Sequence, residues 1–107
     1  MKMFVRIHSF KFQNEFAKDT IKQKLKLVGS EFFLQGLLTQ CFVDIDRTSL
    51  YMINTWQSEQ ASTKVFDDFK GKIFDQMQGM GVKVSILGGK ADILFKDPDL
   101  LEKYTVV

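Results

Sequence analysis

The order of two kinds of apolar pattern limits the folds open to this chain. Apolar residues alternate with other residues over 3–10, 37–45, 50–56 and 82–87. Between the first and second of these segments, and between the third and fourth, apolar residues recur at helical spacing instead. Strand side chains alternate between two faces, whereas helical ones repeat every three to four residues. The pattern therefore predicts the order β-α-β-β-α-β, with a hairpin turn at 46–48.

With two right-handed crossovers, this order of elements forms a single compact sheet. The expected fold is α+β and ferredoxin-like, with a four-stranded antiparallel sheet and both helices on one face. The chain of 107 residues is too short for two domains, so 1–107 is expected to form one domain. Its core is expected at about 3–95, followed by a C-terminal extension at 96–107.

Both helices have recognisable start and stop signals. Asn14 is expected to cap the first helix and Gly29 to end it, with a further turn over 30–34 closed by Gly36. Ser58 is expected to cap a second helix over about 58–78. The core-facing stripes are expected to be Phe16, Ile21, Leu25 and Val28 in the first helix, and Ala61, Val65, Phe66, Phe69, Ile73 and Met77 in the second.

The last third of the chain contains two glycine pairs. Gly79 and Gly81 are expected to close the second helix. Residues 88 and 89 are both Gly, which permits a turn or bend before further strand at 90–95. Pro98 suits the first position of a short C-terminal helix.

Composition narrows the range of partners. Fifteen basic and 13 acidic residues leave a net charge of +2, too balanced to favour nucleic acid or an anionic membrane as the main partner. No apolar run approaches the length of a membrane span, and the N-terminus lacks the pattern of a signal peptide. The one cysteine, Cys41, rules out an internal disulfide and suits a cytoplasmic protein. Its apolar strand predicts a buried thiol.

The chain is rich in aromatic residues, with 11 Phe, two Tyr and one Trp. These are more than a small monomeric core readily holds, which points to a second apolar surface such as a dimer interface or a ligand cavity.

Two helices cover only one face of the predicted sheet. Met3, Val5 and Ile7 form the cleanest apolar set, so we expect them under the helices. The uncovered face would then present Phe4, Arg6, His8, Phe10, Gln40, Phe42, Met52, Asn54 and Trp56. Closed against a second copy, this face would enclose a cavity, so a homodimer is expected.

One segment resembles a known family. The stretch I-N-T-W-Q-S-E-Q-A at 53–61, together with the strand M-F-V-R-I-H at 3–8, resembles the dimeric α+β barrel superfamily, and within it the antibiotic-biosynthesis-monooxygenase-like family. The resemblance implies homodimers whose sheets pack face to face, often with exchanged C-terminal strands. It also implies a pocket in the barrel or between sheet and helices. Some members oxidise aromatic polyketides with O₂ and without metal or flavin, and others degrade haem.

The resemblance implies roles for several residues. In cofactor-free oxidation of a small aromatic or quinol-like metabolite, His8 would act as base. Arg6 and Asn54 would stabilise the resulting anion, and Trp56 would stack on the ring. The remaining predicted substrate contacts are Phe10, Gln40, Phe42 and Met52. The haem-degrading branch has an Asn on the first strand and a Trp and a His on the second helix, and the chain departs from it at all three positions.

Other readings remain open. A non-catalytic small-molecule binder or a structural dimer would use the same fold, with His8 and Trp56 as packing residues and Arg6 paired to Asp44. RNA-recognition domains share the element order, but their third strand requires a basic residue, a Gly and alternating aromatics, whereas the segment R-T-S-L-Y-M-I-N-T-W has no Gly and one aromatic on each face. One His and one Cys give no metal-ligand cluster, and the chain has no nucleotide-binding glycine motif. No metal, cofactor, nucleic-acid or membrane partner is therefore expected.

Overall fold

The structure is a computed structural model, and it describes residues 2–92, apart from the side chains of 70–72 and 74. The strands are β1 (Lys2–Lys11), β2 (Leu37–Asp46), β3 (Ser49–Trp56) and β4 (Lys83–Asp92). The helices are α1 (Glu15–Phe32), the short 3₁₀ helix η1 (Phe33–Gln35) and α2 (Glu59–Gly79). Their order confirms the predicted ferredoxin-like α+β fold. The predicted strand end at 93–95 and the C-terminal helix lie outside the described residues.

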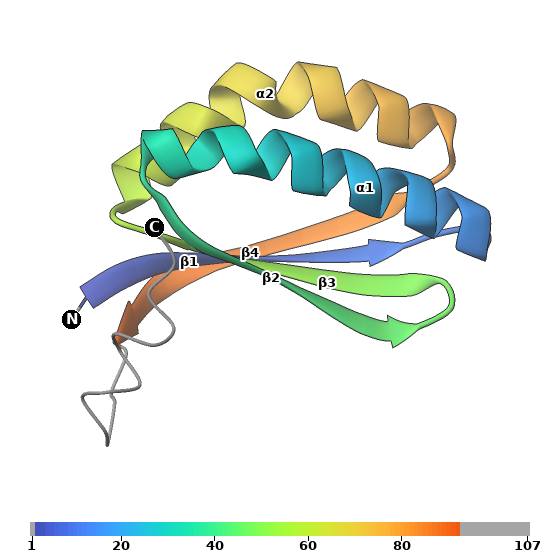
Figure 1. The fold of residues 1–107 in the computed structure, drawn as a ribbon, viewed down its shortest axis with the longest axis horizontal. Coiled ribbons are helices and arrows are strands. Elements are labelled where there is room, and N and C mark those ends of the chain that lie inside the picture. The colour runs from blue at the N-terminus through green and yellow to red at the C-terminus, as the bar shows by residue number, and fades with distance from the viewer. Residues whose placement is uncertain (1, 93–107) are drawn as a thin grey trace.

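All strand pairs are antiparallel, in the order β2-β3-β1-β4. Figure 1 shows α1 and α2 side by side over one face of this sheet. The pairing of β2 with β3 shifts twice, between Leu37 and Thr39 and between Asp44 and Asp46. Between residues 83 and 92, β4 is a single strand, so the glycine pair at 88 and 89 does not interrupt it as the sequence suggested.

Both helices begin at the predicted caps. The Asn14 side chain accepts a hydrogen bond from the Ala17 N–H at 2.8 Å, and Ser58 Oγ accepts one from the Ala61 N–H at 3.1 Å. Each bond satisfies one of the free N–H groups of a first helical turn. The predicted end of α1 at Gly29 is wrong, because the helix continues to Phe32. Gly29 is buried instead, where α1 passes over the Gln40 side chain of β2.

Gly36 joins η1 to β2 in a left-handed conformation, with φ of 103°. A Cβ at this position would also lie 2.9 Å from the Ala61 Cβ. We expect Gly36→Ala to lower the free energy of unfolding by about 2 kcal/mol, because L side chains are strained at positive φ and the contact is too close. Urea unfolding measures this. Gly79→Ala is the matched control, since a Cβ there meets nothing within 4 Å, and it should be neutral or stabilising. Equal stability of both variants would contradict the expectation.

The two faces of the sheet are the reverse of those predicted. Phe4, Arg6, His8 and Phe10 of β1 face the helices, whereas Met3, Val5 and Ile7 lie on the uncovered face. The prediction rested on the rule that the most uniformly apolar side of a strand faces the core. Here the uncovered face is itself apolar, and the helix-covered face contains a cavity with polar walls. We call the uncovered side the open face, and its apolar residues are Met3, Val5, Ile7, Cys41, Val43, Ile45, Tyr51, Ile53 and Leu87.

The exposure of two side chains corrects two further expectations. Cys41 lies exposed on the open face, because β2 turns this side of its pleat away from the helices. Phe16 is 78% exposed rather than part of the core stripe of α1. Its place in the first turn directs it outward, and Ala17 and Lys18 are the buried residues there.

The core under the helices consists of two apolar clusters. One surrounds Phe10, Leu50 and Met52 and packs against Ile21, Leu25 and Met77 of the helices. The other contains Phe4, Phe32, Leu37, Trp56 and Val65. On the sheet, a row of polar side chains lies between the residues of these two clusters.

Candidate functional site

The polar row between the two clusters is produced by strand register. Arg6 of β1 pairs with Asn54 of β3, and Asn54 pairs in turn with Gln40 of β2. Two residue pairs further along, on the same face, His8 lies beside Met52. The three polar side chains therefore form a line across the sheet, beneath the helices and with apolar rows on both sides.

Arg6 links the sheet to α2. Its Nε donates a hydrogen bond to Ser62 Oγ at 2.7 Å, and a terminal nitrogen donates to Thr63 Oγ1 at 3.4 Å. The guanidinium also lies 5.0 Å from the centre of the Phe4 ring, in cation–π geometry. Among the described residues, none of the ion pairs involves Arg6. The predicted alternative partner, Asp44, is instead paired with Lys18 and Lys22 at 3.1 and 2.9 Å.

His8 is held in its neutral form. Burial and the nearby Arg6 charge lower the pKa of His8 from 6.5 to about 4. Both effects act against the imidazolium, since burial removes its hydration and Arg6 repels it. The ring stacks on Phe10, with centres 6.1 Å apart. At neutral pH, His8 is therefore an uncharged imidazole that can accept a proton, but only as a weak base.

Asn54 and Trp56 each have a buried polar atom without a partner among the described residues. Both residues are only 3% exposed, and within residues 2–92 neither Asn54 Oδ1 nor Trp56 Nε1 has a hydrogen-bond partner. Most buried polar groups in proteins are paired, because desolvation without a hydrogen bond is costly. One of these atoms is an acceptor and the other is an N–H donor. Together they are suited to a ligand with both a hydroxyl donor and an oxygen acceptor.

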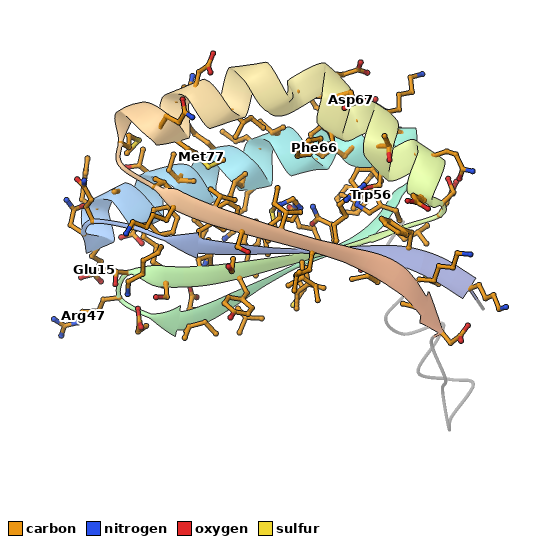
Figure 2. All side chains as sticks on the ribbon, turned by 180° about the vertical axis from the view of Figure 1, so that it is seen from behind. Glu15, Arg47, Trp56, Phe66, Asp67 and Met77 are labelled. Atoms are coloured by element: carbon orange, nitrogen blue, oxygen red, sulfur yellow. The ribbon has the colours of Figure 1, made fainter. Side chains whose placement is uncertain are left out.

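These side chains surround a cavity of about 70 Å³ between the sheet and the helices. Figure 2 shows Trp56 on the helix-covered side of the sheet, beneath the N-terminal half of α2. The sheet provides Arg6, His8, Phe10, Gln40, Met52, Asn54 and Trp56 to the cavity walls. The helices provide Leu25, Val28, Phe32, Ser62, Val65, Phe66, Phe69, Ile73 and Met77.

Seven of the eight predicted site residues thus line one cavity, although on the opposite face from the one expected. The exception is Phe42, which packs against the cluster around Phe10 and lies near the ammonium groups of Lys22 and Lys26, each 6.0 Å from its ring centre. The helical side of the cavity was not predicted. The spacing of Val65, Phe69 and Ile73 marked a buried stripe, but nothing in it distinguished a cavity wall from close packing.

Helix α1 passes close to Gln40 of the sheet because Gly29 has no side chain. A Cβ at Gly29 would lie closer than van der Waals contact to the Gln40 amide. That amide donates a hydrogen bond to the Met52 sulfur at 3.5 Å. Gly29 therefore allows a polar side chain to lie between a helix and the sheet.

Two other features are absent from the described residues. Over residues 2–92, no group of three or more His, Cys, Asp or Glu side chains is placed to hold a metal ion. No helix within the same range is long and apolar enough to cross a membrane.

No protein-family model matches the chain, and no curated protein matches it in sequence. Solved structures do match. A dimeric ferredoxin-like protein from an uncultured marine organism has a TM-score of 0.71 and 13% identity, covering 91% of this chain and 94% of its own. A Deinococcus radiodurans protein provisionally assigned as an antibiotic biosynthesis monooxygenase has a TM-score of 0.74 and 12% identity, covering 89% and 98%. SnoaB of Streptomyces nogalater, a cofactor-independent oxygenase, has a TM-score of 0.65 and 12% identity, covering 90% and 97%.

At identities this low, the likeness concerns the fold, and it confirms the resemblance expected from the sequence at that level. The chain has the ferredoxin-like α+β fold shared by dimeric ferredoxin-like proteins and antibiotic biosynthesis monooxygenase-like proteins.

Proposed function

We propose that this protein is a cofactor-independent monooxygenase that oxidises a small aromatic or quinol-like metabolite in the cavity between sheet and helices. The observation that supports this most directly is the pair of unpartnered buried atoms, Asn54 Oδ1 and Trp56 Nε1, in a cavity that also contains Arg6 and a neutral His8. A substrate hydroxyl would donate to Asn54, and a second substrate oxygen would accept from Trp56. The cavity volume of about 70 Å³ is less than the roughly 150 Å³ that holds a benzene ring in another protein, so the substrate is a single ring at most and enters as the cavity walls move apart.

The residues divide the chemistry between charge stabilisation and proton transfer. Arg6 would favour the ionised form of a substrate hydroxyl, because an adjacent positive charge lowers the pKa of an acid. His8 would accept the proton, and the substrate anion beside it would raise the pKa of His8 toward the working range. The anion is the electron-rich form that reacts with O₂. For a phenol with a free para position, one O₂ gives one quinone and one water, so the substrate supplies all the electrons.

A cofactor-independent oxygenase among the structural neighbours supports the same chemistry. Oxygen uptake tests it directly. The purified protein is incubated in air with phenol, catechol and hydroquinone, and O₂ consumption and quinone absorbance are followed together. We expect uptake proportional to protein concentration, and its loss in Asn54→Leu, which cannot accept the substrate hydroxyl. Uptake that is equal in heat-unfolded protein would contradict the proposal.

A second candidate function is binding without turnover, and the low pKa of His8 favours it. A base with a pKa of about 4 removes a phenol proton poorly unless the substrate anion is strongly stabilised. The same incubations separate the two functions. A ligand that raises the melting temperature without O₂ uptake would identify a binding protein.

We further propose that the protein forms a homodimer through the open face. Its apolar residues include Leu87, which is 67% exposed and lies across the strands from Ile7 and Ile53. A contiguous apolar surface of this kind is unusual on a monomer. A dimeric ferredoxin-like structural neighbour supports a second copy as its cover.

Leu87→Lys is expected to convert the dimer into a monomer, because two-fold packing would bury the added charge in both copies. Light scattering coupled to size-exclusion chromatography measures the mass. The matched control is Leu34→Lys, since Leu34 is 94% exposed but lies in η1, away from the open face. A wild-type monomer at micromolar concentration, or equal dissociation of both variants, would contradict the proposed interface.

A further inference from the structure

The outer surface of the helix layer contains a second hollow. It is a groove of about 260 Å³ between α1 and α2. Among the described residues, five aliphatic and two polar side chains line it. The wall residues are Ile21, Leu25, Leu27, Val28, Ile73, Lys24 and Gln76. We call this hollow the helix groove.

The helix groove and the cavity share three wall residues, Leu25 and Val28 of α1 and Ile73 of α2. Leu25 is buried, whereas Val28 and Ile73 are half-buried. A single layer of side chains therefore separates the groove from the cavity. Aliphatic side chains change rotamer rapidly, so such a layer can open without unfolding either helix.

A hydrogen bond crosses the helix groove from one helix to the other. Lys24 Nζ of α1 donates a hydrogen bond to Gln76 Oε1 of α2 at 2.9 Å. Both residues are exposed, so water can replace this hydrogen bond at little cost. It therefore holds the helices together only weakly at this point.

We infer that small molecules enter the cavity through the helix groove, past a gate formed by Leu25, Val28 and Ile73. An aliphatic gate admits neutral, largely apolar molecules and excludes ions, because an ion would lose its hydration on passing. The inference concerns access alone and holds whether or not the bound molecule is oxidised. A competing entry would pass beside β4 at Gly88, where an added Cβ would lie 3.1 Å from the Arg6 guanidinium and 3.1 Å from the Phe4 ring. Entry there would bring a molecule against the Arg6 charge, so it would favour anions.

The fluorescence of Trp56 measures access to the cavity and does not require the ligand to be identified. It is the single Trp of the chain, it is buried, and it lines the cavity. Its fluorescence can be quenched only by a molecule that comes close to it. Acrylamide is small and neutral, whereas iodide is an anion. Entry through the gate predicts quenching by acrylamide and little by iodide, while entry beside Arg6 predicts effective quenching by iodide.

A reversible lock tests the route. Lys24→Cys and Gln76→Cys are combined with Cys41→Ser, and the two thiols are joined by a short bis-methanethiosulfonate linker, which dithiothreitol removes. We expect the lock to reduce the acrylamide quenching constant several-fold, and reduction to restore it. The matched control is the same variant carrying methyl methanethiosulfonate on both thiols, which adds similar bulk without joining the helices. It should remain close to wild type.

Unchanged acrylamide quenching in the locked protein would overturn the inference, as would iodide quenching that matches acrylamide. Val28 provides an independent check that requires no linker. Val28→Ala should increase acrylamide quenching and Val28→Phe should decrease it, because the side chain lies in the shared wall. Equal acrylamide quenching in Val28→Ala and Val28→Phe would also overturn the inference.

Discussion

Arg6→Met is expected to reduce turnover of a phenolic substrate by about 100-fold, the usual effect of removing one group that stabilises a developing anion. Methionine keeps much of the length of the arginine but has no charge to hold a phenolate in the cavity. The hydrogen bond from Arg6 to Ser62 is also lost. Measurement of kcat and kcat/KM under air gives the size of the effect.

Two controls separate the charge of Arg6 from other effects. Lys11→Met removes a positive charge from the same strand, but Lys11 is exposed at its end and bonds Thr48 and Ser49 rather than lining the cavity. It should leave turnover unchanged. In addition, Arg6→Met should raise the pKa of His8, since the Arg6 charge is one of the two causes that lower it. His8 is the single His of the chain, so one NMR titration shows this. Equal turnover in Arg6→Met and wild type would contradict the role of Arg6.

Acidification is expected to destabilise the protein through His8 by about 3 kcal/mol, since one pKa unit corresponds to about 1.4 kcal/mol. The pKa of His8 is about 4 in the folded chain and 6.5 as its ordinary value. Between these values the unfolded chain binds a proton that the folded chain does not, so stability falls as the pH drops from 6.5 to 4. Urea unfolding at a series of pH values measures the change, and His8→Gln should remove this part of it.

Other groups contribute in a different pH range. The pKa of Asp44 is lowered by hydrogen bonds from Lys22 and Lys18, and that of Asp46 by hydrogen bonding to Thr48. Their contributions are present above the ordinary pKa of 3.8 and are lost as the pH falls through the lowered values. The upper part of the His8 range, from pH 6.5 to about 5, therefore isolates His8. A pH profile of His8→Gln that matches wild type over this range would show that His8 titrates normally in the folded protein.

The fold was predictable because it depends on order and periodicity. Alternation located the four strands, and Asn14 and Ser58 marked the helix starts by the chemistry of their side chains. The positions of Gly29 and Gly36 were harder to read. Either glycine can end a helix, and the choice depends on the Gln40 side chain, which approaches Gly29 from a distant strand.

That these side chains lie together was predictable, but the face on which they lie was not. Arg6, His8, Asn54 and Trp56 share one cavity because strand alternation puts them on one side of adjacent strands. The choice between the two sides rested on the rule that the more apolar side faces the core, and that rule fails when both sides are apolar. The helical walls, such as Phe69 and Ile73, depend on how closely two helices pack, which residue spacing does not specify.

A sheet with apolar residues on both faces has a consequence for folding. When only one face is apolar, a strand that pairs one residue out of step exposes its apolar side chains, and this penalty enforces the native pairing. Here Ile53 on one face and Met52 on the other would both find apolar neighbours after such a slip. The native pairing of β2 with β3 is therefore selected by local features at its ends. One is the turn, in which the Asp46 side chain accepts a hydrogen bond from the Thr48 N–H at 2.9 Å. The others are the two shifts in pairing, one beside this turn and one at the opposite end of the paired strands.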